Sequence, residues 1–420
     1  MKQRTHETSG KRHKAGKRTR RSRSEAAERG GWTSGNRLKL LENGEEYYPR
    51  LYARMAEARR QILIETFIWF EDRVGTEFAS HLIDAARRGV EVRVTADGYG
   101  SPGFSSDFLA ELHDAGVKVQ LFDPRPTLFR IRTNVLCRLH RKIAVIDGET
   151  AFVGGINYSD DHLRELSGAS KQDFVVEVEG PAVPEIRDYV QSRMTARDGP
   201  WSRRWRYWLR RFPRDLQRPH ADAQVLFATR DNDQHSTDIE TLYRIAIRNA
   251  KTRIVIANAY FLPGYRFIRD LLRARKRGVE VELLMQGSPD LPLAIGMASV
   301  LFDGLASAGV KIHRYMERPL HAKVAVVDDH WATVGSSNLD PISLGLNYEA
   351  NLFVLDRDFN LALRRSLDRL IASSCEQYTI GTPTSSLLRR LLAALVFHLT
   401  RRVSTWGVRM SGRRQRITPM

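Results

Sequence analysis

The sequence predicts an α/β protein made of two related α-β-α sandwich halves, packed pseudo-symmetrically with one active site at their interface. Three observations support this fold class. The chain has 420 residues, about two to three times the length of an ordinary domain. From about residue 37, short β-branched runs alternate with amphipathic helical stretches. The same order of segments then recurs in the second part of the chain.

Each copy of the repeat is predicted to run strand, helix, strand. The first copy comprises QILIETFIWF (61–70), GTEFASHLIDAARRG (75–89) and VEVRVTADG (90–98). The second comprises RIVIANAYFL (253–262), GYRFIRDLLRARKRG (264–278) and VEVELLMQG (279–287). Strands connected through a helix usually lie parallel in a sheet. A largely parallel sheet is therefore expected.

The composition limits the kinds of binding partner and the cellular compartment that can be expected. The formal net charge is +18, which favours an anionic partner, either nucleic acid or an acidic membrane surface. The two cysteines, Cys137 and Cys375, have no spacing typical of a disulfide framework or a metal site, which favours a reducing compartment. No apolar stretch reaches the roughly 18 residues of a transmembrane helix, and no apolar core follows the basic N-terminus as in a signal peptide.

The repeat and the charge distribution suggest five segments. They are a disordered basic arm (1–30), a first half (31–198), an aromatic and Arg-rich insertion (199–222), a second half (223–380) and a basic Leu-rich tail (381–420). The arm carries ten Lys or Arg and one acid before residue 25, and the tail carries eight Arg. The tail segment SLLRRLLAALVFHLTRR (386–402) has a Leu-rich face with cationic ends, which is typical of association with a membrane surface.

The insertion allows two interpretations. On a helix, one face would hold four aromatic side chains, Trp201, Trp205, Trp208 and Phe212, opposite a face rich in arginine. Such a helix suits the headgroup layer of a membrane. The same aromatic stripe could instead be buried where the two halves join. The Leu-rich tail favours the membrane interpretation.

The most informative feature is a motif that occurs twice, as LHRKIAVIDGETAFVGGIN (139–157) and LHAKVAVVDDHWATVGSSNLD (320–340). In both copies Lys lies two residues after His, Asp seven, Gly fourteen and Asn seventeen. A single histidine on an apolar strand is usually a core residue, but a lysine on the same face in both copies requires an anion. The predicted active site therefore combines His140 and Lys142 with His321 and Lys323.

Two His/Lys/Asn sets match the needs of phosphodiester chemistry. Cationic and hydrogen-bonding groups surround the phosphate, one neutral imidazole attacks phosphorus, and a second, protonated imidazole donates to the leaving oxygen. This chemistry needs no metal or other cofactor, and the sequence contains no evident ligand cluster. Asp147 and Asp328 complete the motif and are counted with its catalytic residues, although the strand period turns them away from the lysines, toward a bracing role.

These residues resemble the phospholipase D superfamily, whose signature HxKxxxxD followed by GGxN or GSxN is present twice. The resemblance covers about residues 37–380 and implies a covalent phosphohistidine, with His140 as the nucleophile and His321 as acid and then base, or the reverse. It implies phosphate binding by Lys142, Asn157, Lys323, Ser336 and Asn338. It also implies that Asp173 and Glu349 orient the histidines.

The segments DPRPTLFRIRTN (123–134), KQDF (171–174), NAYFLPGYRF (258–267) and SSNLDPISLGLNYEAN (336–351) further resemble bacterial cardiolipin synthases of the B type. This implies transfer of a phosphatidyl group from phosphatidylglycerol to a primary hydroxyl of a second phospholipid, with release of glycerol. The expected setting is the cytoplasmic face of the bacterial inner membrane, peripherally bound to anionic phospholipid, without a nucleic-acid partner. Hydrolysis to phosphatidic acid, a nuclease, and a binding module with a retired site remain alternatives.

Overall fold

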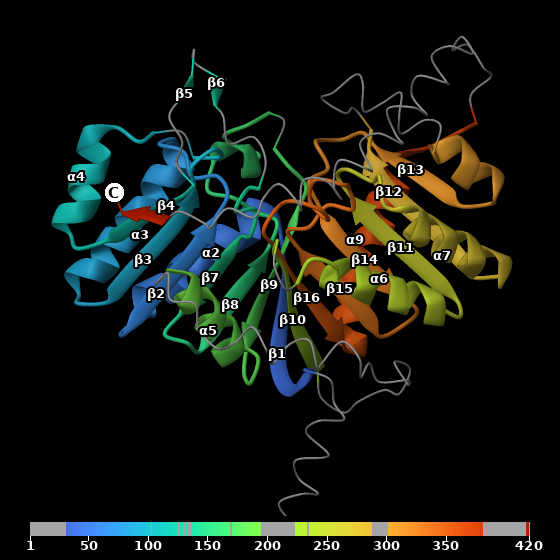
Figure 1. Ribbon diagram of the computed structural model, residues 1–420, viewed down its shortest axis with the longest axis horizontal. Helices are drawn as coiled ribbons and strands as arrows, with labels where there is room; N and C mark the ends of the chain where they lie inside the picture. The colour runs from blue at the N-terminus through green and yellow to red at the C-terminus, as the bar shows by residue number, and fades with distance from the viewer. Residues whose placement is uncertain are drawn as a thin grey trace, which may run out of the picture.

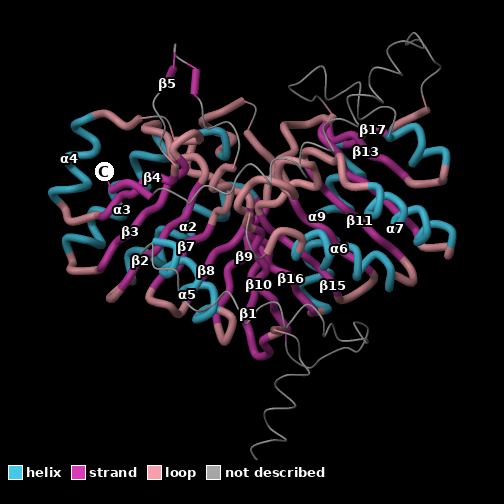
Figure 2. The backbone as a smooth tube through the Cα atoms, viewed as in Figure 1, coloured by secondary structure: helices cyan, strands magenta, loops and turns pink. Residues whose placement is uncertain are grey.

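The computed structural model describes residues 31–101, 103–123, 127–128, 131–132, 137–168, 170–194, 223–232, 235–287, 301–380 and 417–419. In this part of the chain, sixteen strands form one continuous twisted sheet with helices on both faces (Figures 1 and 2). None of its helices is both long enough and apolar enough to cross a bilayer. The predicted arm (1–30) and insertion (199–222) lie outside the described residues, as does most of the predicted tail.

The first half contributes strands β1 (Thr33–Glu42), β2 (Gln61–Thr66), β3 (Glu91–Asp97), β4 (Lys118–Phe122), β5 (Thr127–Leu128), β6 (Ile131–Arg132), β7 (Ile143–Ile146), β8 (Thr150–Gly154) and β9 (Phe174–Glu179). Its helices are α2 (Asn43–Glu57), α3 (Arg73–Arg87), α4 (Ser106–Asp114), the short η1 (Asp160–His162) and α5 (Val183–Met194). β5 and β6 form a separate two-stranded hairpin.

The second half contributes strands β10 (Ala223–Arg230), β11 (Arg253–Asn258), β12 (Glu280–Gln286), β13 (Lys311–Tyr315), β14 (Lys323–Val327), β15 (Trp331–Gly335), β16 (Glu349–Leu355) and β17 (Cys375–Gln377). Its helices are α6 (Asp238–Asn249), α7 (Tyr265–Lys276) and α9 (Arg357–Ser374). From the predicted tail, residues Ile417–Pro419 form β18, which pairs with the first-half strand β4.

Apart from the outermost strands β17 and β18, the sheet order is a palindrome of equivalent strands, which confirms the two related halves. It runs β17-β13-β12-β11-β14-β15-β16-β10 and then β1-β9-β8-β7-β2-β3-β4-β18. The pseudo-twofold axis therefore passes between β10 and β1, which are antiparallel neighbours. That pairing is short, because only Thr33 and Asn36 of β1 are in register with β10 before β1 continues along β9.

The expectation of a largely parallel sheet was wrong. Only the strands joined through helices, β2-β3-β4 and β11-β12-β13, are parallel among the described pairs. The motif strands β7 and β14 instead turn back tightly into β8 and β15, and tight turns force antiparallel pairing. Asp147 and Gly148 make the first of these turns with φ of 55° and 68°, and an Asp-Gly pair favours such values.

Helices cover the sheet because each presents one apolar stripe. In α3, for example, the buried residues Val74, Phe78 and Leu82 recur every four positions, and Asp72 caps the helix by accepting a hydrogen bond from Gly75 N at 2.9 Å. α2, α3 and α4 enclose one apolar core with the first half, and α6 and α7 enclose another with the second. A third core, under α5 and α9, contains residues of both halves and so joins them.

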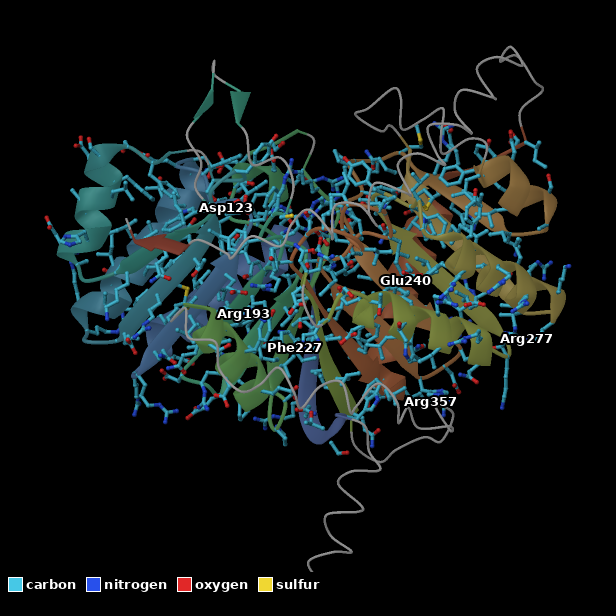
Figure 3. All side chains as sticks on the ribbon, viewed as in Figure 1. Asp123, Arg193, Phe227, Glu240, Arg277 and Arg357 are labelled. Carbon is cyan, nitrogen blue, oxygen red and sulfur yellow. The ribbon has the colours of Figure 1, made fainter. Side chains whose placement is uncertain are left out.

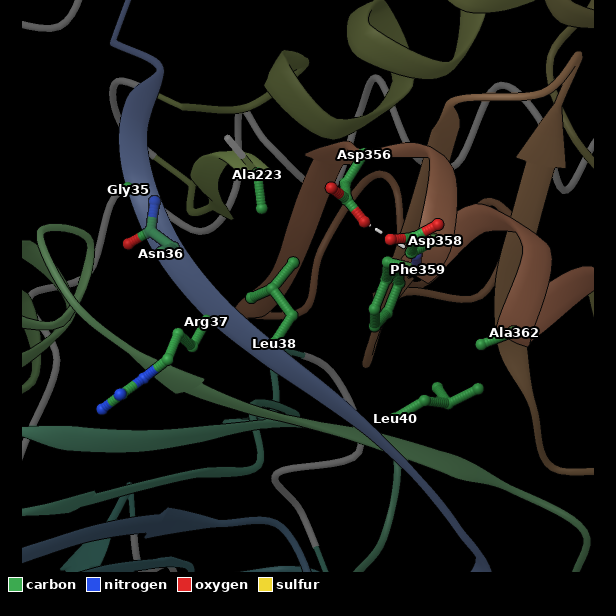
Figure 4. Close-up of a pocket in the computed structure, with 10 residues that line it drawn as sticks. All are labelled: Gly35, Asn36, Arg37, Leu38, Leu40, Ala223, Asp356, Asp358, Phe359 and Ala362. Atoms are coloured by element: carbon green, nitrogen blue, oxygen red, sulfur yellow. Dashed lines mark hydrogen bonds between the residues drawn. The ribbon is translucent and has the colours of Figure 1, made fainter. Parts of the chain in front are cut away.

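A pocket of about 480 Å³ opens between β1 and the start of α9, where the pairing of β1 with β10 ends (Figure 4). Its lining residues are Gly35, Asn36, Arg37, Leu38, Leu40, Ala223, Asp356, Asp358, Phe359 and Ala362. None of the predicted site residues lines it. The pocket is therefore a feature of the join between the halves and not the active site.

One buried ion pair distinguishes the halves. Arg141 donates to the carboxylate of Glu65 on β2 at 2.6 and 3.0 Å, and both residues are at most 2% exposed. At the equivalent positions the second half has Ala322, which follows the motif histidine, and Ala257 on β11. A buried ion pair stabilises the fold little more than an apolar pair would. Removal of one partner, however, leaves the other as an uncompensated buried charge.

We expect Arg141→Ala to lower the free energy of unfolding by about 3–5 kcal/mol, because Glu65 is left buried without its partner. The double variant Glu65→Ala/Arg141→Ala reproduces the alanine pair of the second half. Its free energy of unfolding should fall clearly less than that of Arg141→Ala. Urea denaturation of both variants measures the difference. An equal or greater loss in the double variant would contradict this account of the ion pair.

Candidate active site

The two motif histidines lie at the same edge of the sheet, each immediately before a motif strand. The backbone holds each in contact with the opposite half. His140 N donates to Tyr348 O and His321 N donates to Gln172 O, both at 2.9 Å. Isolated parallel bridges at Leu139 with Tyr348 and at Leu320 with Gln172 extend both contacts. The motif segments are therefore fixed across the join and meet there.

Each histidine is also paired with a buried carboxylate from the other half. His140 Nδ1 lies 2.9 Å from Glu349 Oε2 at the start of β16. His321 Nδ1 lies 2.5 Å from Asp173 Oδ2, next to β9. Both carboxylates are 0% exposed. A carboxylate accepts from N–H, so each ring holds its proton at Nδ1 and leaves Nε2 for a reacting atom.

The motif lysines are buried beside the histidines, on the face that the strand period predicts. Lys142 Nζ donates to His140 O at 2.8 Å, and Lys323 Nζ donates to His321 O. The exposed fractions are 5% for Lys142 and 0% for Lys323. Desolvation lowers the pKa of Lys142 well below its ordinary value and that of Lys323 to about 8. Buried ammonium groups of this kind require a nearby anion.

The two histidines and the two lysines are electrostatically coupled. Desolvation lowers the pKa of His140 to about 4 and that of His321 well below 6.5. The charges of both lysines lower the pKa of each histidine further, while Glu349 raises that of His140. Both rings are therefore neutral in the empty site at neutral pH.

Charge balance predicts what an incoming phosphodiester does. The charges of two protonated lysines and of two ionised carboxylates, Asp173 and Glu349, cancel when both histidines are neutral. A phosphodiester brings one negative charge, which favours the uptake of one proton by the histidine pair. One imidazole then remains a nucleophile while the other becomes an acid, as two-step phosphoryl transfer requires.

The motif aspartates lie at the far end of the motif strands from the histidines. The Asp147 carboxylate accepts from the backbone N–H groups of residues 59–61 at 2.7–2.9 Å. The Asp328 carboxylate accepts in the same way from the N–H groups of residues 251–253. Counting Asp147 and Asp328 with the catalytic residues does not fit these positions, because their carboxylates are bound to loops. We propose the bracing role that the strand period favoured.

The motif asparagines are buried close to the site. Asn157 Oδ1 accepts from Ile68 N at 3.1 Å, which fixes its carboxamide next to the end of β2. Asn338 is 8% exposed, and its Oδ1 has no hydrogen-bond partner in the described part of the chain. Phosphate binding by these two side chains stays a prediction.

Ser336 contacts a carboxylate, which differs from its predicted contact with phosphate. Its hydroxyl donates to Glu349 Oε2 at 2.5 Å and accepts from Ala350 N at 3.0 Å, and the residue is 0% exposed. The serine thereby helps to keep the pKa of Glu349 low, together with His140 and Lys142. We therefore propose that Ser336 positions Glu349 and does not bind the phosphate.

The equivalent position in the first half explains why the two copies differ there. A Cβ on Gly155 would lie 2.3–2.6 Å from the carboxylate atoms of Asp173. The shorter aspartate thus reaches His321 only because residue 155 has no side chain. The longer Glu349 leaves room for a serine. Gly155 with Asp173 and Ser336 with Glu349 are two matched pairs.

Sequence reasoning missed two residues that anchor the motif segments. Asp97, at the end of β3, accepts from Leu139 N at 2.7 Å, and Gln286, at the equivalent end of β12, accepts from Leu320 N. Each therefore fixes the residue before a motif histidine. Burial raises the pKa of Asp97 to about 6. The signal was available, because alignment of the two copies places Asp97 opposite Gln286.

Sequence reasoning also missed His162, which is 0% exposed. Its ring centre lies 5.8 Å from that of His321 at an interplanar angle of 71°, and Asn157 N donates to its Nε2 at 3.3 Å. Desolvation lowers its pKa well below 6.5, so His162 packs as a neutral ring beside His321. It has no counterpart in the second motif, where the equivalent residue is Ser343.

The predicted membrane residues Trp201, Trp205, Trp208 and Phe212 lie outside the described residues, so neither interpretation of the insertion is decided. Where the structure does describe the chain, no group of three or more His, Cys, Asp or Glu side chains is arranged to hold a metal ion.

Mirrored motif strands that bring two His/Lys pairs together at the join define the fold and the site of the phospholipase D class. A family profile described as "Cardiolipin synthase, PLD-like domain" matches residues 51–194 and 243–371, one match in each half. The chain belongs to this family.

Relatives and solved structures agree with this assignment. Cardiolipin synthase B of Escherichia coli (strain K12) is 46% identical over 371 residues, covering 88% of this chain and 89% of the relative. Cardiolipin synthase A of Pseudomonas putida (strain W619) is 31% identical over 88% of this chain and 75% of its own length. The crystal structure of phosphatidylserine synthase from Haemophilus influenzae Rd KW20 superposes with a TM-score of 0.66 over 92% of this chain and 98% of that chain, at 14% identity. That last likeness concerns the fold alone.

We expect Gly155→Ala to lower phosphodiester turnover by about 100-fold or more, because the new Cβ displaces Asp173 from His321 and small misplacements are that costly. Stopped assays on a synthetic phosphodiester measure the rate, and thermal unfolding shows whether the variant stays folded.

The matched control is Gly155→Ser/Asp173→Glu, which copies the pair of the second half. It should recover part of the activity that Gly155→Ala loses. A double variant no better than the single one would show that the two pairs are not interchangeable units.

Proposed function

We propose that the protein is a cardiolipin synthase that transfers a phosphatidyl group from phosphatidylglycerol to a primary hydroxyl of a second phospholipid and releases glycerol. The main observation behind this proposal is that each of the two histidines is hydrogen-bonded to a carboxylate of the other half. Membership of the cardiolipin synthase family and 46% identity to cardiolipin synthase B over 88% of the chain support the lipid substrate. The enzyme is a phosphatidyltransferase.

In the first step, Nε2 of neutral His140 attacks phosphorus and the bond to the glycerol oxygen breaks. His321, protonated in response to the bound phosphodiester, gives its proton to that oxygen, and glycerol leaves. In the second step, a primary hydroxyl of the acceptor lipid gives its proton to His321 and attacks phosphorus. The bond to His140 then breaks and cardiolipin forms.

The assignment of His140 as nucleophile is supported by its carboxylate. Ser336, His140 and Lys142 keep the pKa of Glu349 below its ordinary value, whereas burial raises the pKa of Asp173. A firmly charged Glu349 stabilises the positive charge that a phosphohistidine places on its ring. Lys142 and Lys323, with Asn157 and Asn338, surround the phosphate oxygens.

The proposed setting is the anionic surface of the bacterial inner membrane on its cytoplasmic face, with the protein bound peripherally. The net charge of +18 suits attraction to anionic headgroups, which are abundant on that leaflet. Nucleic acid is not part of the proposal.

The pKa values predict a bell-shaped dependence of kcat/KM on pH. The pKa of His140 is lowered to about 4, so the neutral nucleophile is lost as the pH falls through that value. Two groups set the fall at higher pH. His321 must carry a proton to act as the acid, and its pKa lies well below 6.5, so kcat/KM falls as the pH rises through that lowered value. The pKa of Lys323 is lowered to about 8, so its charge, and with it the attraction for phosphate, is lost as the pH rises through that value, which steepens the fall. Rates on a soluble short-chain phosphatidylglycerol between pH 3.5 and 10, roughly bracketing both values, measure the profile.

Lys323→Arg is the matched control, because arginine keeps its charge throughout this range. In this variant the steepening near pH 8 should disappear, while the falls that His321 and Lys142 cause remain, because the pKa values of both are also lowered. A profile that Lys323→Arg leaves unchanged would contradict the role given to Lys323.

Mass spectrometry of lipid products tests the function. Wild type mixed with phosphatidylglycerol vesicles should yield cardiolipin and glycerol without a nucleotide activator, and His140→Ala and His321→Ala should each lower the yield at least ~1,000-fold. Phosphatidic acid as the main product would indicate a hydrolase. Cleavage of DNA or RNA that His140→Ala abolishes would indicate a nuclease.

The mass of the intact protein separates the two histidines. With a donor whose leaving group needs no acid, such as a 4-nitrophenyl ester, His321→Ala should accumulate the phosphatidyl adduct and His140→Ala should not. The opposite result would reverse the two roles and leave the reaction itself intact.

A further inference from the structure

Helix α7 carries an exposed row of four cations, Arg266, Arg269, Arg273 and Lys276. Their spacing of three or four residues places them along one side of the helix, over about 15 Å. None of the four forms an ion pair within the part of the chain that the structure describes. The buried face of the same helix, which includes Phe267 and Leu271, packs on the sheet.

The equivalent helix of the first half shows that this row is not a general property of the fold. Alignment of the two copies places the four cations opposite Glu77, Ser80, Asp84 and Arg87 of α3. These residues are exposed as well, and their formal charge is −1 where α7 has +4. The buried positions of the two helices match, since Phe78 and Leu82 align with Phe267 and Leu271. Only the outer faces have diverged.

Neighbouring acids leave the row positive. The acid of α7 itself, Asp270, is 1% exposed and bound to Arg244 of α6 at 2.9 Å. Glu240 of α6 lies near Gly264, at the start of α7, and is only half-buried. Figure 3 shows Glu240 on the inner side of the second half and Arg277, the C-terminal cap of α7, at the outer rim.

Exposed apolar side chains adjoin the N-terminal end of this row. Tyr265, the first residue of α7, is 55% exposed, Tyr260 is 38% exposed and Ile342 is 50% exposed. The chain holds their segments together, because Leu262 N donates to Leu339 O at 2.7 Å and Phe261 bridges to Leu339. Among described residues, the exposed large apolar side chains are otherwise Met316, Leu361 and Ile380.

This apolar edge borders the active site. Ala259 N donates to Ala322 O at 3.1 Å, so Tyr260 follows a residue bonded directly next to His321. His140 is 8% exposed, and the lysines are more deeply buried. A lipid phosphate that approaches the site from this side passes these apolar residues, while its acyl chains stay in an apolar phase.

We propose that the cationic row of α7, together with Tyr260, Tyr265 and Ile342, is the surface by which the protein docks on an anionic phospholipid bilayer. The proposal rests on the proposed function, since it takes the substrates to be membrane lipids. The four cations bind headgroup phosphates, and the aromatic and aliphatic side chains insert at the headgroup boundary. Docking there turns the His321 side of the active site toward the lipid.

The combination of groups favours a bilayer over a nucleic acid. Both partners would bind the cations, but an exposed isoleucine beside two tyrosines gains free energy only when it leaves water for an apolar phase. The dependence on anionic lipid and the insertion of apolar residues are therefore separate signatures of the same surface.

The test uses the full chain and the variant Tyr265→Ser/Arg269→Ser/Arg273→Ser. Cosedimentation with phosphatidylglycerol/phosphatidylcholine vesicles should show at least about tenfold weaker partition than wild type, given the contribution of each cation near an anionic surface. The kcat/KM on short-chain phosphatidylglycerol below its critical micelle concentration should stay within about twofold of wild type, because no site residue is altered.

The matched control is Leu361→Ser/Arg357→Ser/Arg365→Ser on α9, which removes one exposed apolar residue and two exposed arginines elsewhere. Arg357 lies at the lower edge of the second half in this view, below Glu240 (Figure 3). This variant should bind vesicles within about twofold of wild type, since its residues do not face the lipid.

Each outcome is decisive. Unchanged vesicle binding by the α7 variant, or an equal loss in the α9 control, would overturn the docking surface. So would equal partition into pure phosphatidylcholine vesicles, or binding to DNA that the α7 substitutions weaken while vesicle binding stays intact. Failure of wild type to turn over any lipid would instead refute the proposed function, and the vesicle-binding result would still stand on its own.

Discussion

The hydrogen bond between each histidine and a carboxylate of the opposite half is the interaction on which the whole site depends. It sets the proton position on both rings, places Nε2 toward the substrate and fixes the two halves at the catalytic edge. At the other edge the halves are held by the short pairing of β1 with β10. The two halves are thus held together at both ends of the join. At the catalytic end, the same histidine–carboxylate hydrogen bonds both hold the halves together and prepare the histidines for the reaction.

Much of this arrangement could be predicted from sequence, because a duplicated register is strong information. The spacing of His140 with Lys142, and of His321 with Lys323, placed each pair on one strand face. The same strand period predicted that Asp147 points away from the lysines, and in the structure its carboxylate accepts hydrogen bonds from the backbone of residues 59–61. The internal repeat predicted the two halves. These inferences needed only local periodicity, which the chain carries within a few residues.

What could not be predicted depends on tertiary contacts. No local pattern indicates that Glu349 faces His140 and Asp173 faces His321, because the pairs are separated by 209 and 148 residues. A parallel sheet was expected because strand-helix-strand segments indicate parallel pairing. The Asp147-Gly148 sequence, which indicates a tight turn and therefore antiparallel pairing, was not taken into account. The hydroxyl of Ser336 was assigned to phosphate because its carboxylate neighbour lies on another strand.

The crossed carboxylates have an evolutionary consequence. A single copy of this repeat cannot complete either half of the site, so an ancestor with one copy would have worked only as a twofold-symmetric dimer with two identical histidines. Fusion into one polypeptide removed that identity constraint. Gly155 with Asp173 and Ser336 with Glu349 could then diverge as sets, and the two imidazoles were free to become unequal partners in a reaction with two unequal steps.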